Sequence, residues 1–352
     1  MEIKQRNWRF DYLKGIACII VILLHVPLPG VIGDGIIYAC RFSVPIFFMI
    51  TGYYTEKKDN KWILKKIRQL LTKLLIAELL YGIWKLLLHI VMDGKTVAEF
   101  FENWSFIKHP IRVIFCGSFF NGIFWYIYAL IWAYVLVIVL RKIKWIYSNL
   151  FRIIATLFLV VVLVVGRFVM QNMVEIDEYT FLFCNALVFA LPMMMTGMLF
   201  ARKEEDIREK FSLGKNVLLL FIGGAVMVAE YIFSRQYMDF HFSTLIISSS
   251  VFMFAFVYNK ESILGKKSLS FIGQNLSLWI YLDHIFVNHL CRLIAFCLEI
   301  LDNNIYKYLH PFIVIVLSIA MAYIIYRIKL HSLKTERKMK NNRGQKQYET
   351  QT

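Results

Sequence analysis

The sequence predicts an all-α fold, namely a polytopic integral membrane helical bundle of about ten transmembrane helices with both termini in the cytoplasm. Two features of the chain lead to this prediction. Hydrophobic residues make up 59% of its 352 residues and charged residues only 18%, whereas ordinary soluble domains hold roughly 25% charged residues. The apolar residues also cluster in runs close to the ~20 residues that a membrane-spanning helix requires.

These apolar runs are the expected helices. In chain order they occupy residues 9–27, 36–55, 69–92, 122–140, 151–170, 180–200, 216–234, 241–258, 275–298 and 311–328. The first run follows a basic N-terminus, as in a signal peptide, but Pro27 and Pro29 follow it in place of a small-residue cleavage site, so we expect a retained helix. We expect a single membrane domain over residues 1–332. A basic, disordered cytoplasmic tail should follow over 333–352, in solution or on the inner leaflet.

The basic residues predict the orientation of the bundle, because cytoplasmic loops of membrane proteins are rich in Lys and Arg. With the N-terminus inside, the predicted inner segments hold 29 of the 40 Lys and Arg residues, and the outer loops hold six. The inner segments are residues 1–9, 56–68, 141–152, 201–215, 260–267 and 327–352. Both termini are therefore expected in the cytoplasm.

Charge and cysteine content exclude two other classes of protein. The net charge of +16 is spread over six short inner segments and forms no single basic stripe. Membrane lipid is therefore the expected partner for this charge, and no nucleic acid is expected. The six cysteines lie mostly within spans and include no Cys-x-x-Cys pair. We therefore expect neither a disulfide framework nor a metal site.

The first predicted helix carries an acid, a base and an imidazole, a costly combination within lipid. Asp11 and Lys14 lie toward its cytoplasmic end and His25 at its outer end. Lys14 and His25 are eleven residues apart, about three helical turns, so they share nearly one face and lie roughly 16 Å apart along the axis. The structural alternative is an i,i+3 ion pair between Asp11 and Lys14 at the interface, with His25 merely ending the helix.

Other ionisable residues fall within the predicted spans. The short loop after the first helix should bring Arg41 near His25, and Glu78, Asp283 and His284 lie near mid-membrane. Groups at such depths usually face a protein interior or a wet cavity and find partners there. They form either a functional site or a network that fixes helix packing.

Five motifs follow one another along nearly the whole chain. They are Asp11-x-x-Lys14-Gly with His25, Arg41-Phe-Ser-Val-Pro45-Ile-Phe-Phe-Met-Ile-Thr-Gly52-Tyr-Tyr, Lys65-Lys66-Ile-Arg68-Gln-Leu-Leu, Phe124-Trp125-Tyr126-Ile-Tyr128-Ala-Leu, and Leu276-Ser277-Leu-Trp279-Ile-Tyr281-Leu-Asp-His284. Together, in this order, they resemble the membrane acyltransferase-3 family. The chain departs from the family pattern at three places. Lys14 stands where arginine is usual, Lys66 and Arg68 do not reproduce an arginine pair spaced by three, and Asp283 replaces an apolar residue.

The resemblance implies an integral membrane O-acyltransferase of the bacterial cell membrane. Such an enzyme moves an acyl group, most often acetyl, from acetyl-CoA to a hydroxyl of a cell-envelope glycan or related acceptor. His25 is then the general base, or a transient acyl carrier, and Arg41 or an aromatic hydroxyl stabilises the oxyanion. Lys14, oriented by Asp11, would bind the acyl-CoA donor together with Lys66 and Arg68. The remaining candidates for the acceptor site or polar network are Glu78, Trp125, Tyr126, Tyr281, Asp283 and His284.

The alternative is a transporter or exporter of an amino acid or polysaccharide that uses the same buried polar network. Part of the chain, Val44-Pro45-Ile-Phe-Phe-Met-Ile-Thr-Gly52-Tyr-Tyr above all, also resembles the membrane half of bacterial membrane-bound serine racemases, for which substrate uptake is the inferred role. No inverted repeat and no pair of interrupted helices is evident in the sequence, which counts against a carrier.

The partition of basic residues makes a topological prediction. In a variant whose native cysteines are replaced, single cysteines at Glu102 and Asp177 should react with an impermeant maleimide from outside the cell. Cysteines at Lys58 and Glu205 should react only after the membrane is opened. Labelling of positions 58 and 102 from the same side would contradict the predicted topology.

Overall fold

The computed structural model describes residues 7–91, 94–102, 110–117, 119–173, 183–234, 241–258 and 265–349. Over these ranges every regular element is helical and there is no strand. The predicted all-α fold is therefore confirmed. Asp177, one of the proposed labelling positions, lies outside the described residues.

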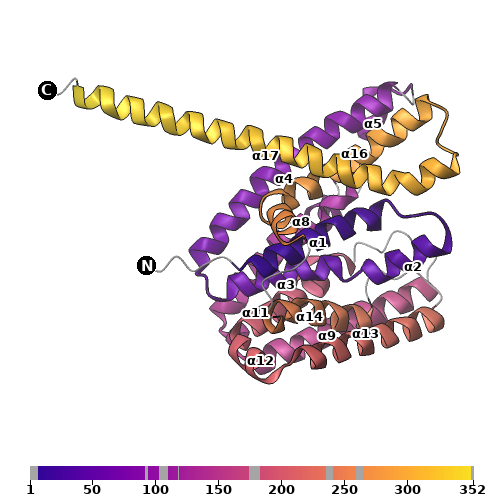
Figure 1. The fold of residues 1–352 in the computed structure, drawn as a ribbon, viewed down its shortest axis with the longest axis vertical. Helices are drawn as coiled ribbons and strands as arrows, with labels where there is room; N and C mark the ends of the chain where they lie inside the picture. Colours follow the sequence, from indigo (N-terminus) through magenta and orange to yellow (C-terminus); the bar gives the residue numbers. More distant parts are fainter. Residues whose placement is uncertain are drawn as a thin grey trace. The chain divides into compact units, whose positions relative to one another are not determined.

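The contacts of the chain divide into two compact units. Unit 1 combines Met1–Cys40 with Ser262–Thr352, and unit 2 is Arg41–Glu261. Unit 1 is thus built from the two ends of the chain, and in Figure 1 its indigo and orange helices lie together. The expectation of a single domain over residues 1–332 stays a prediction.

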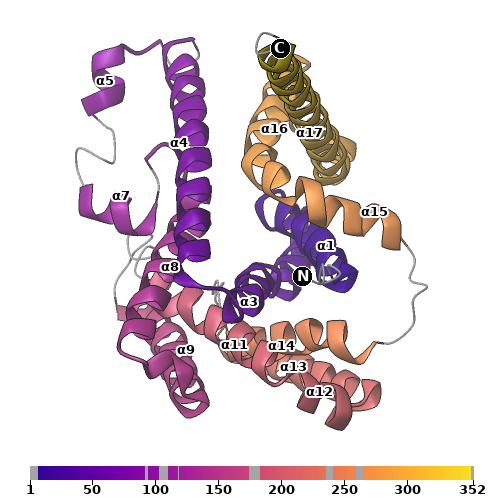
Figure 2. The same cartoon turned by 90° about the vertical axis from the view of Figure 1, so that its left-hand side faces the viewer.

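Unit 1 consists of the first two helices and the last helices of the chain. In chain order its elements are α1 (Trp8–His25), α2 (Gly30–Cys40), α15 (Lys266–Phe271), the π-helical turn η4 (Ile272–Leu276), α16 (Ser277–Cys297) and α17 (Asn304–Glu349). The side chain of Asn7 starts α1 by accepting a hydrogen bond from the Arg9 amide at 3.1 Å. Helix α1 packs on α15 and η4, and α16 packs on α17 (Figure 2).

Two glycines let α1 approach α15 and η4 at backbone distance. A Cβ on Gly15 would collide with the carbonyl oxygen of Leu269, and a Cβ on Gly273 would collide with the carbonyl oxygen of Asp11. Any larger residue at either position would therefore force the backbones apart. These glycines fix which residues of α1 lie opposite which residues of η4 and α16.

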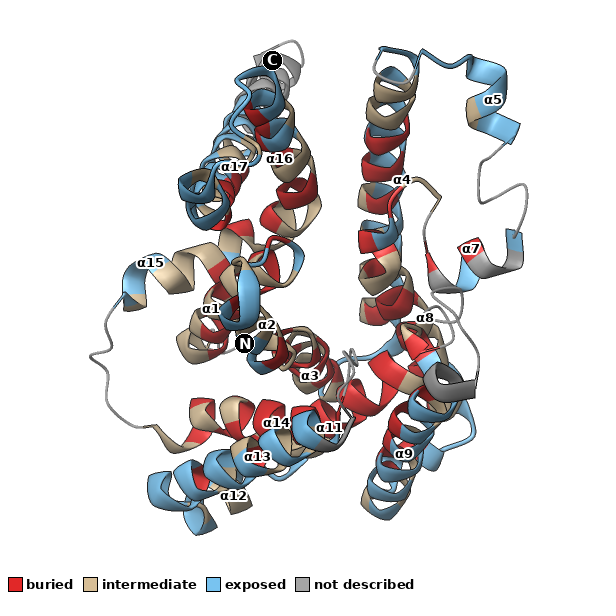
Figure 3. Ribbon diagram, turned by 90° about the vertical axis from the view of Figure 1, so that its right-hand side faces the viewer, coloured by how far each residue is buried: buried red, intermediate tan, exposed pale blue. Residues whose placement is uncertain are grey.

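Unit 2 holds the remaining helices. They are α3 (Ser43–Glu56), α4 (Asn60–Val91), α5 (Val97–Glu102), α7 (Pro110–Cys116), η1 (Gly122–Phe124), α8 (Trp125–Lys142), η2 (Trp145–Tyr147), α9 (Asn149–Met173), η3 (Ala186–Ala190), α11 (Leu191–Arg202), α12 (Glu204–Lys210), α13 (Leu213–Ser234) and α14 (Phe242–Val257). Its core is the α3–α11 pair, where Gly52 meets the carbonyl oxygen of Met194 and Gly197 that of Met49. Helix α11 is buried along most of its length, whereas α13 is largely exposed (Figure 3).

Among the described residues, seven helices are long and apolar enough to cross a membrane, and an eighth span results if a bent helix pair is counted. The other two predicted spans, α1 and α14, are helical, but one holds too many charged residues and the other is too short to count as a membrane span. The 18 residues of α1 include three charged ones, Arg9, Asp11 and Lys14. Helix α14 has 16 residues, about 24 Å, which is shorter than the ~30 Å hydrocarbon core. The count of ten and the orientation of the termini stay predictions.

Two observations concern the ends of predicted spans. Helix α17 continues to Glu349, and the Lys, Arg, Gln and Glu residues that are frequent in its last part are good helix formers. The expectation of a disordered tail over 333–352 stays a prediction. The helix pair Ala186–Arg202 and Glu204–Lys210 bends by 70°.

Candidate active site

Helix α1 carries three of the predicted site residues. Lys14 Nζ lies 3.9 Å from Asp11 Oδ1, so the predicted i,i+3 ion pair is present. Asp11 is buried and Lys14 is half-buried. The carbonyl of Asp11 also lies at the close crossing with Gly273, which holds this end of α1 in place. The role of the pair in binding a donor stays a prediction.

One face of α1 points to η4 and α16 over its whole length. Asp11, Cys18 and His25 are seven residues apart, two helical turns, and therefore lie on one stripe. Asp11 meets Gly273, and the Cys18 thiol donates to the carbonyl oxygen of Ser277 at an Sγ to oxygen distance of 3.6 Å. At the end of the stripe the His25 ring lies 5.2 Å, centroid to centroid, from the ring of His284.

The two histidines differ in their surroundings. His25 is exposed, whereas His284 is completely buried. His284 Nδ1 lies 2.9 Å from the carbonyl oxygen of Ile280, one turn earlier in α16. A carbonyl oxygen can only accept, so Nδ1 of His284 carries the proton. The ring of Tyr281 lies 6.2 Å from that of His284.

Asp283 is buried beside His284 in the sequence. Its side chain is 4% exposed, and neither carboxyl oxygen has a hydrogen-bond partner among the described residues. A buried carboxylate without a partner is costly in a low-dielectric interior. The sequence identified Asp283 and His284 as a pair, and the structure shows that His284 is the one in ring contact with His25.

The other predicted residues belong to unit 2. Glu78 is buried and accepts hydrogen bonds from the Phe120 amide at 3.0 Å and from the Tyr128 hydroxyl at 3.4 Å. It therefore ties α4 to the chain that leads into α8. Trp125 and Tyr126, at the start of α8, pack on Phe48 of α3, with ring centroids 6.5 Å and 4.7 Å away.

The predicted basic residues of unit 2 are Arg41, Lys66 and Arg68. Arg41 is half-buried at the start of the unit, and its expected placement near His25 stays a prediction. Lys66 lies over the Trp62 ring, with Nζ 5.2 Å from the centroid, and Arg68 is exposed. A role for Lys66 and Arg68 in donor binding also stays a prediction. Among the described residues, no group of His, Cys, Asp and Glu could hold a metal ion.

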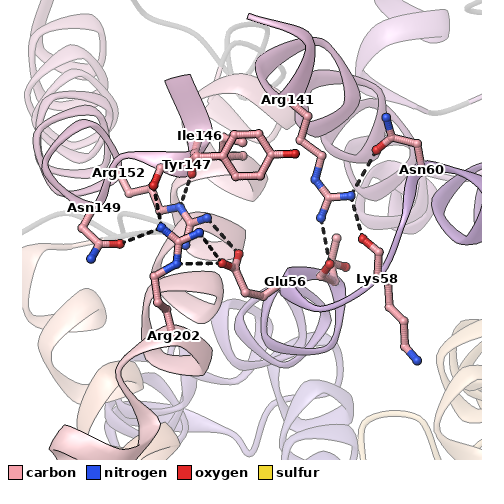
Figure 4. A network of polar contacts seen from close by, with 10 residues as sticks. Glu56, Lys58, Asn60, Arg141, Ile146, Tyr147, Asn149, Arg152 and Arg202 are labelled. Atoms are coloured by element: carbon pink, nitrogen blue, oxygen red, sulfur yellow. Dashed lines mark hydrogen bonds and ion pairs between the residues drawn. The ribbon is translucent and has the colours of Figure 1, made fainter. Parts of the chain in front are cut away.

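Sequence reasoning missed a buried arginine network where α3, α9 and α11 meet (Figure 4). Glu56 accepts from Arg152 at 2.8 Å and pairs with Arg202 at 2.7 Å. Arg152 is 1% exposed. Nearby, Arg141 donates to the carbonyl oxygens of Thr55 and Lys58 and to the Asn60 side chain, at 2.9, 2.8 and 3.1 Å. In the sequence these arginines read as ordinary cytoplasmic loop charges, and only Glu56, at the end of an apolar motif, hinted at pairing.

Comparison with known proteins supports the resemblance seen in the sequence. The acyltransferase-3 family model, described as an acyltransferase domain, matches residues 7–327. The match therefore covers residues from both units. No curated protein and no solved structure matches the chain.

The arginine network makes a prediction about stability. Glu56→Gln leaves the charge of buried Arg152 uncompensated, so it should lower the free energy of unfolding by roughly 3 kcal/mol. Arg152→Gln should cost more than Arg202→Gln, because the Arg202 side chain is 31% exposed and water can replace its partner. Thermal unfolding in detergent measures this series, with the exposed Glu205→Gln as control. Equal midpoints for Glu56→Gln and the control would contradict the prediction.

Proposed function

The chain belongs to the acyltransferase-3 family, and from this premise we propose that it is a membrane O-acyltransferase that uses His25 as its general base. The donor would be acetyl-CoA or another acyl-CoA, and the acceptor a hydroxyl of a cell-envelope glycan or related molecule. The membrane in question would be the bacterial cell membrane. The observation that carries the proposal is the exposed imidazole of His25 at the end of a helix, in ring contact with the buried imidazole of His284.

The proposed reaction needs one proton acceptor and one site for developing negative charge. His25 would take the proton from the acceptor hydroxyl while that oxygen attacks the thioester carbonyl. As the tetrahedral intermediate collapses, the carbon–sulfur bond breaks and the proton passes from His25 to the coenzyme A thiolate. Arg41 or an aromatic hydroxyl is the sequence-based candidate for stabilising the oxyanion.

Lys14 is the proposed donor-binding group at the other end of α1. By helix geometry it lies roughly 16 Å from His25, a distance that an extended phosphopantetheine arm can bridge. Lys14 is half-buried and its ammonium is 3.9 Å from the Asp11 carboxylate, so it is oriented without being fully neutralised. Lys66 and Arg68 are further sequence-based candidates for binding the donor phosphates.

The alternative is transport of a solute through the same buried polar network. The bend of 70° between α11 and α12 falls at the charged segment Glu204–Lys210, so it does not give α11 the mid-membrane break of a discontinuous transporter helix. The decisive comparison uses one preparation of proteoliposomes. Transfer of labelled acetyl from acetyl-CoA to glycan acceptors, without uptake of labelled amino acid or glycan, would support the enzyme. Uptake without transfer would support the carrier.

The enzyme proposal makes a prediction for His25. His25→Ala should insert and fold normally but lower acyl transfer by roughly 10²-fold to 10⁴-fold, the range for a lost general base. Labelled-acetyl transfer in proteoliposomes is the measurement, with His310→Ala in α17 as the matched control. Near-full turnover in His25→Ala would refute this mechanism.

A second prediction separates a donor-binding Lys14 from a structural one. Lys14→Gln should weaken acetyl-CoA binding, whereas Lys14→Arg should preserve or strengthen it, because the guanidinium fork suits phosphate. Calorimetric titration of the purified protein with acetyl-CoA measures both. The double variant with Asp11→Asn and Lys14→Gln is the control, since it removes the ion pair as a whole. If its affinity is normal, Lys14 only balances Asp11, and the donor phosphates must bind elsewhere.

A further inference from the structure

The contact between His25 and His284 is imposed by the packing of α1 in unit 1. The crossing at Gly15 and Gly273 leaves no room for a Cβ, so α1 cannot slide along η4 without a backbone collision. Three residues after Gly15, the hydrogen bond from Cys18 to the Ser277 carbonyl continues the same register. His25 therefore reaches the position opposite His284 as the third point on a fixed stripe.

The backbone of α16 determines which nitrogen of His284 faces away from its own helix. The Ile280 carbonyl oxygen accepts from Nδ1 at 2.9 Å, so the proton of a neutral ring sits on Nδ1. Nε2 then holds a lone pair. This nitrogen has no hydrogen-bond partner among the described residues, although the side chain is completely buried. A buried acceptor without a donor is costly, and such groups are rare unless they have a function.

His284 is poorly placed to be a base for a substrate. Its ring has no exposed surface, whereas His25 is exposed. A proton on both rings would place two cations side by side, one of them completely buried, so His284 should stay neutral when His25 is charged. Asp283 is also buried, and of these two neighbouring residues it is His284 whose ring lies beside the ring of His25.

The separation of the two rings fits a direct hydrogen bond. Imidazole nitrogens lie about 1.2 Å from the ring centroid, so a centroid distance of 5.2 Å leaves about 2.8 Å between two nitrogens that point at each other, within the hydrogen-bond range. The ring planes are tilted by 45°. Rotation of the exposed His25 side chain can bring one of its nitrogens onto this line.

We propose that His284 is the positioning residue for His25. Its Nε2 accepts a hydrogen bond from one ring nitrogen of His25, while the other ring nitrogen of His25 takes the proton of the acceptor hydroxyl. The inference rests on the proposed function. In this step the hydroxyl proton moves to one nitrogen of His25, the other nitrogen keeps its own proton and donates it to His284 as a hydrogen bond, and no proton moves to His284. The buried histidine thus selects the tautomer of the base and stabilises the imidazolium, as an orienting carboxylate does in other sites.

Two conservative variants of His284 distinguish this role from simple packing. An asparagine amide can occupy the place of Nδ1 and still donate to Ile280, but it removes the acceptor at Nε2. A glutamine amide oxygen reaches the place of Nε2 and restores that acceptor. We therefore expect His284→Asn to lower kcat by about 10²-fold, His284→Gln to retain most of kcat, and both to bind acetyl-CoA normally.

The control for these variants is Asn and Gln at His310, which should change neither kcat nor donor affinity. If His284 only fills space, His284→Asn and His284→Gln should lower the yield or the unfolding temperature alike, and the surviving molecules should turn over normally. Equal kcat in the two variants, or full kcat in His284→Asn, would overturn the proposal.

A double-variant cycle tests whether His284 acts through His25. When His25→Ala is already present, His284→Asn should cause little further loss, because a positioning residue has nothing left to position. Losses that multiply would mean that His284 acts by itself, which contradicts the proposal.

A measurement without turnover completes the test. In protein labelled with 15N-histidine and placed in nanodiscs, the resonances missing in His25→Ala identify His25. These resonances should move in His284→Asn and stay in place in the His310 control. Unmoved His25 resonances would overturn the pairing even if no acceptor were available. By contrast, a wild-type protein without any acyl transfer would refute the proposed function, and a transferring wild type with full kcat in His284→Asn would refute only this inference.

Discussion

The cost of a charge inside a membrane is the constraint on which the rest of this structure depends. An ionised side chain within hydrocarbon must find a partner, reach water or lose its charge. Glu56 forms ion pairs with two arginines, and Asp11 forms one with Lys14. Glu78 accepts hydrogen bonds from a backbone amide and a tyrosine hydroxyl. Each pairing joins separate elements or fixes one helix end, so satisfying charge also determines how the helices pack.

Close backbone contact is a second consequence of the lipid environment. Lipid tails are as apolar as leucine, so helices gain little from burying apolar side chains and gain more from close van der Waals packing. The glycine contacts at Gly15 and Gly273 in unit 1, and at Gly52 and Gly197 in unit 2, provide that packing. In unit 1 the contact also covers the charged end of α1, which composition alone would leave as a poor membrane span.

Sequence reasoning recovered the features that depend on local composition. Apolar runs located the helices, because insertion of a segment into a bilayer depends on the hydropathy of that segment. The 11, 18 and 25 stripe is also visible in the sequence, yet its partner helix is not, because the Cys18 and Ser277 contact spans most of the chain. Burial of Arg152 could not be predicted either, since a buried arginine and a loop arginine follow the same positive-inside rule. What fails to follow from sequence is therefore the pairing of distant segments.

That long-range pairing has a consequence for how the proposed base and its positioning residue are brought together. His25 lies in the first helix and His284 in α16, so their contact cannot form until nearly the whole chain has been made. Helix α1 has three charged residues, and it can pack on α15 and η4 only after those later elements have been made. Membrane helices insert first and associate afterwards, so α1 must wait as a marginal span while unit 2 is completed. The positioned base therefore exists only in the finished bundle, because the packing that covers the charges of α1 is the same packing that places His284 behind His25.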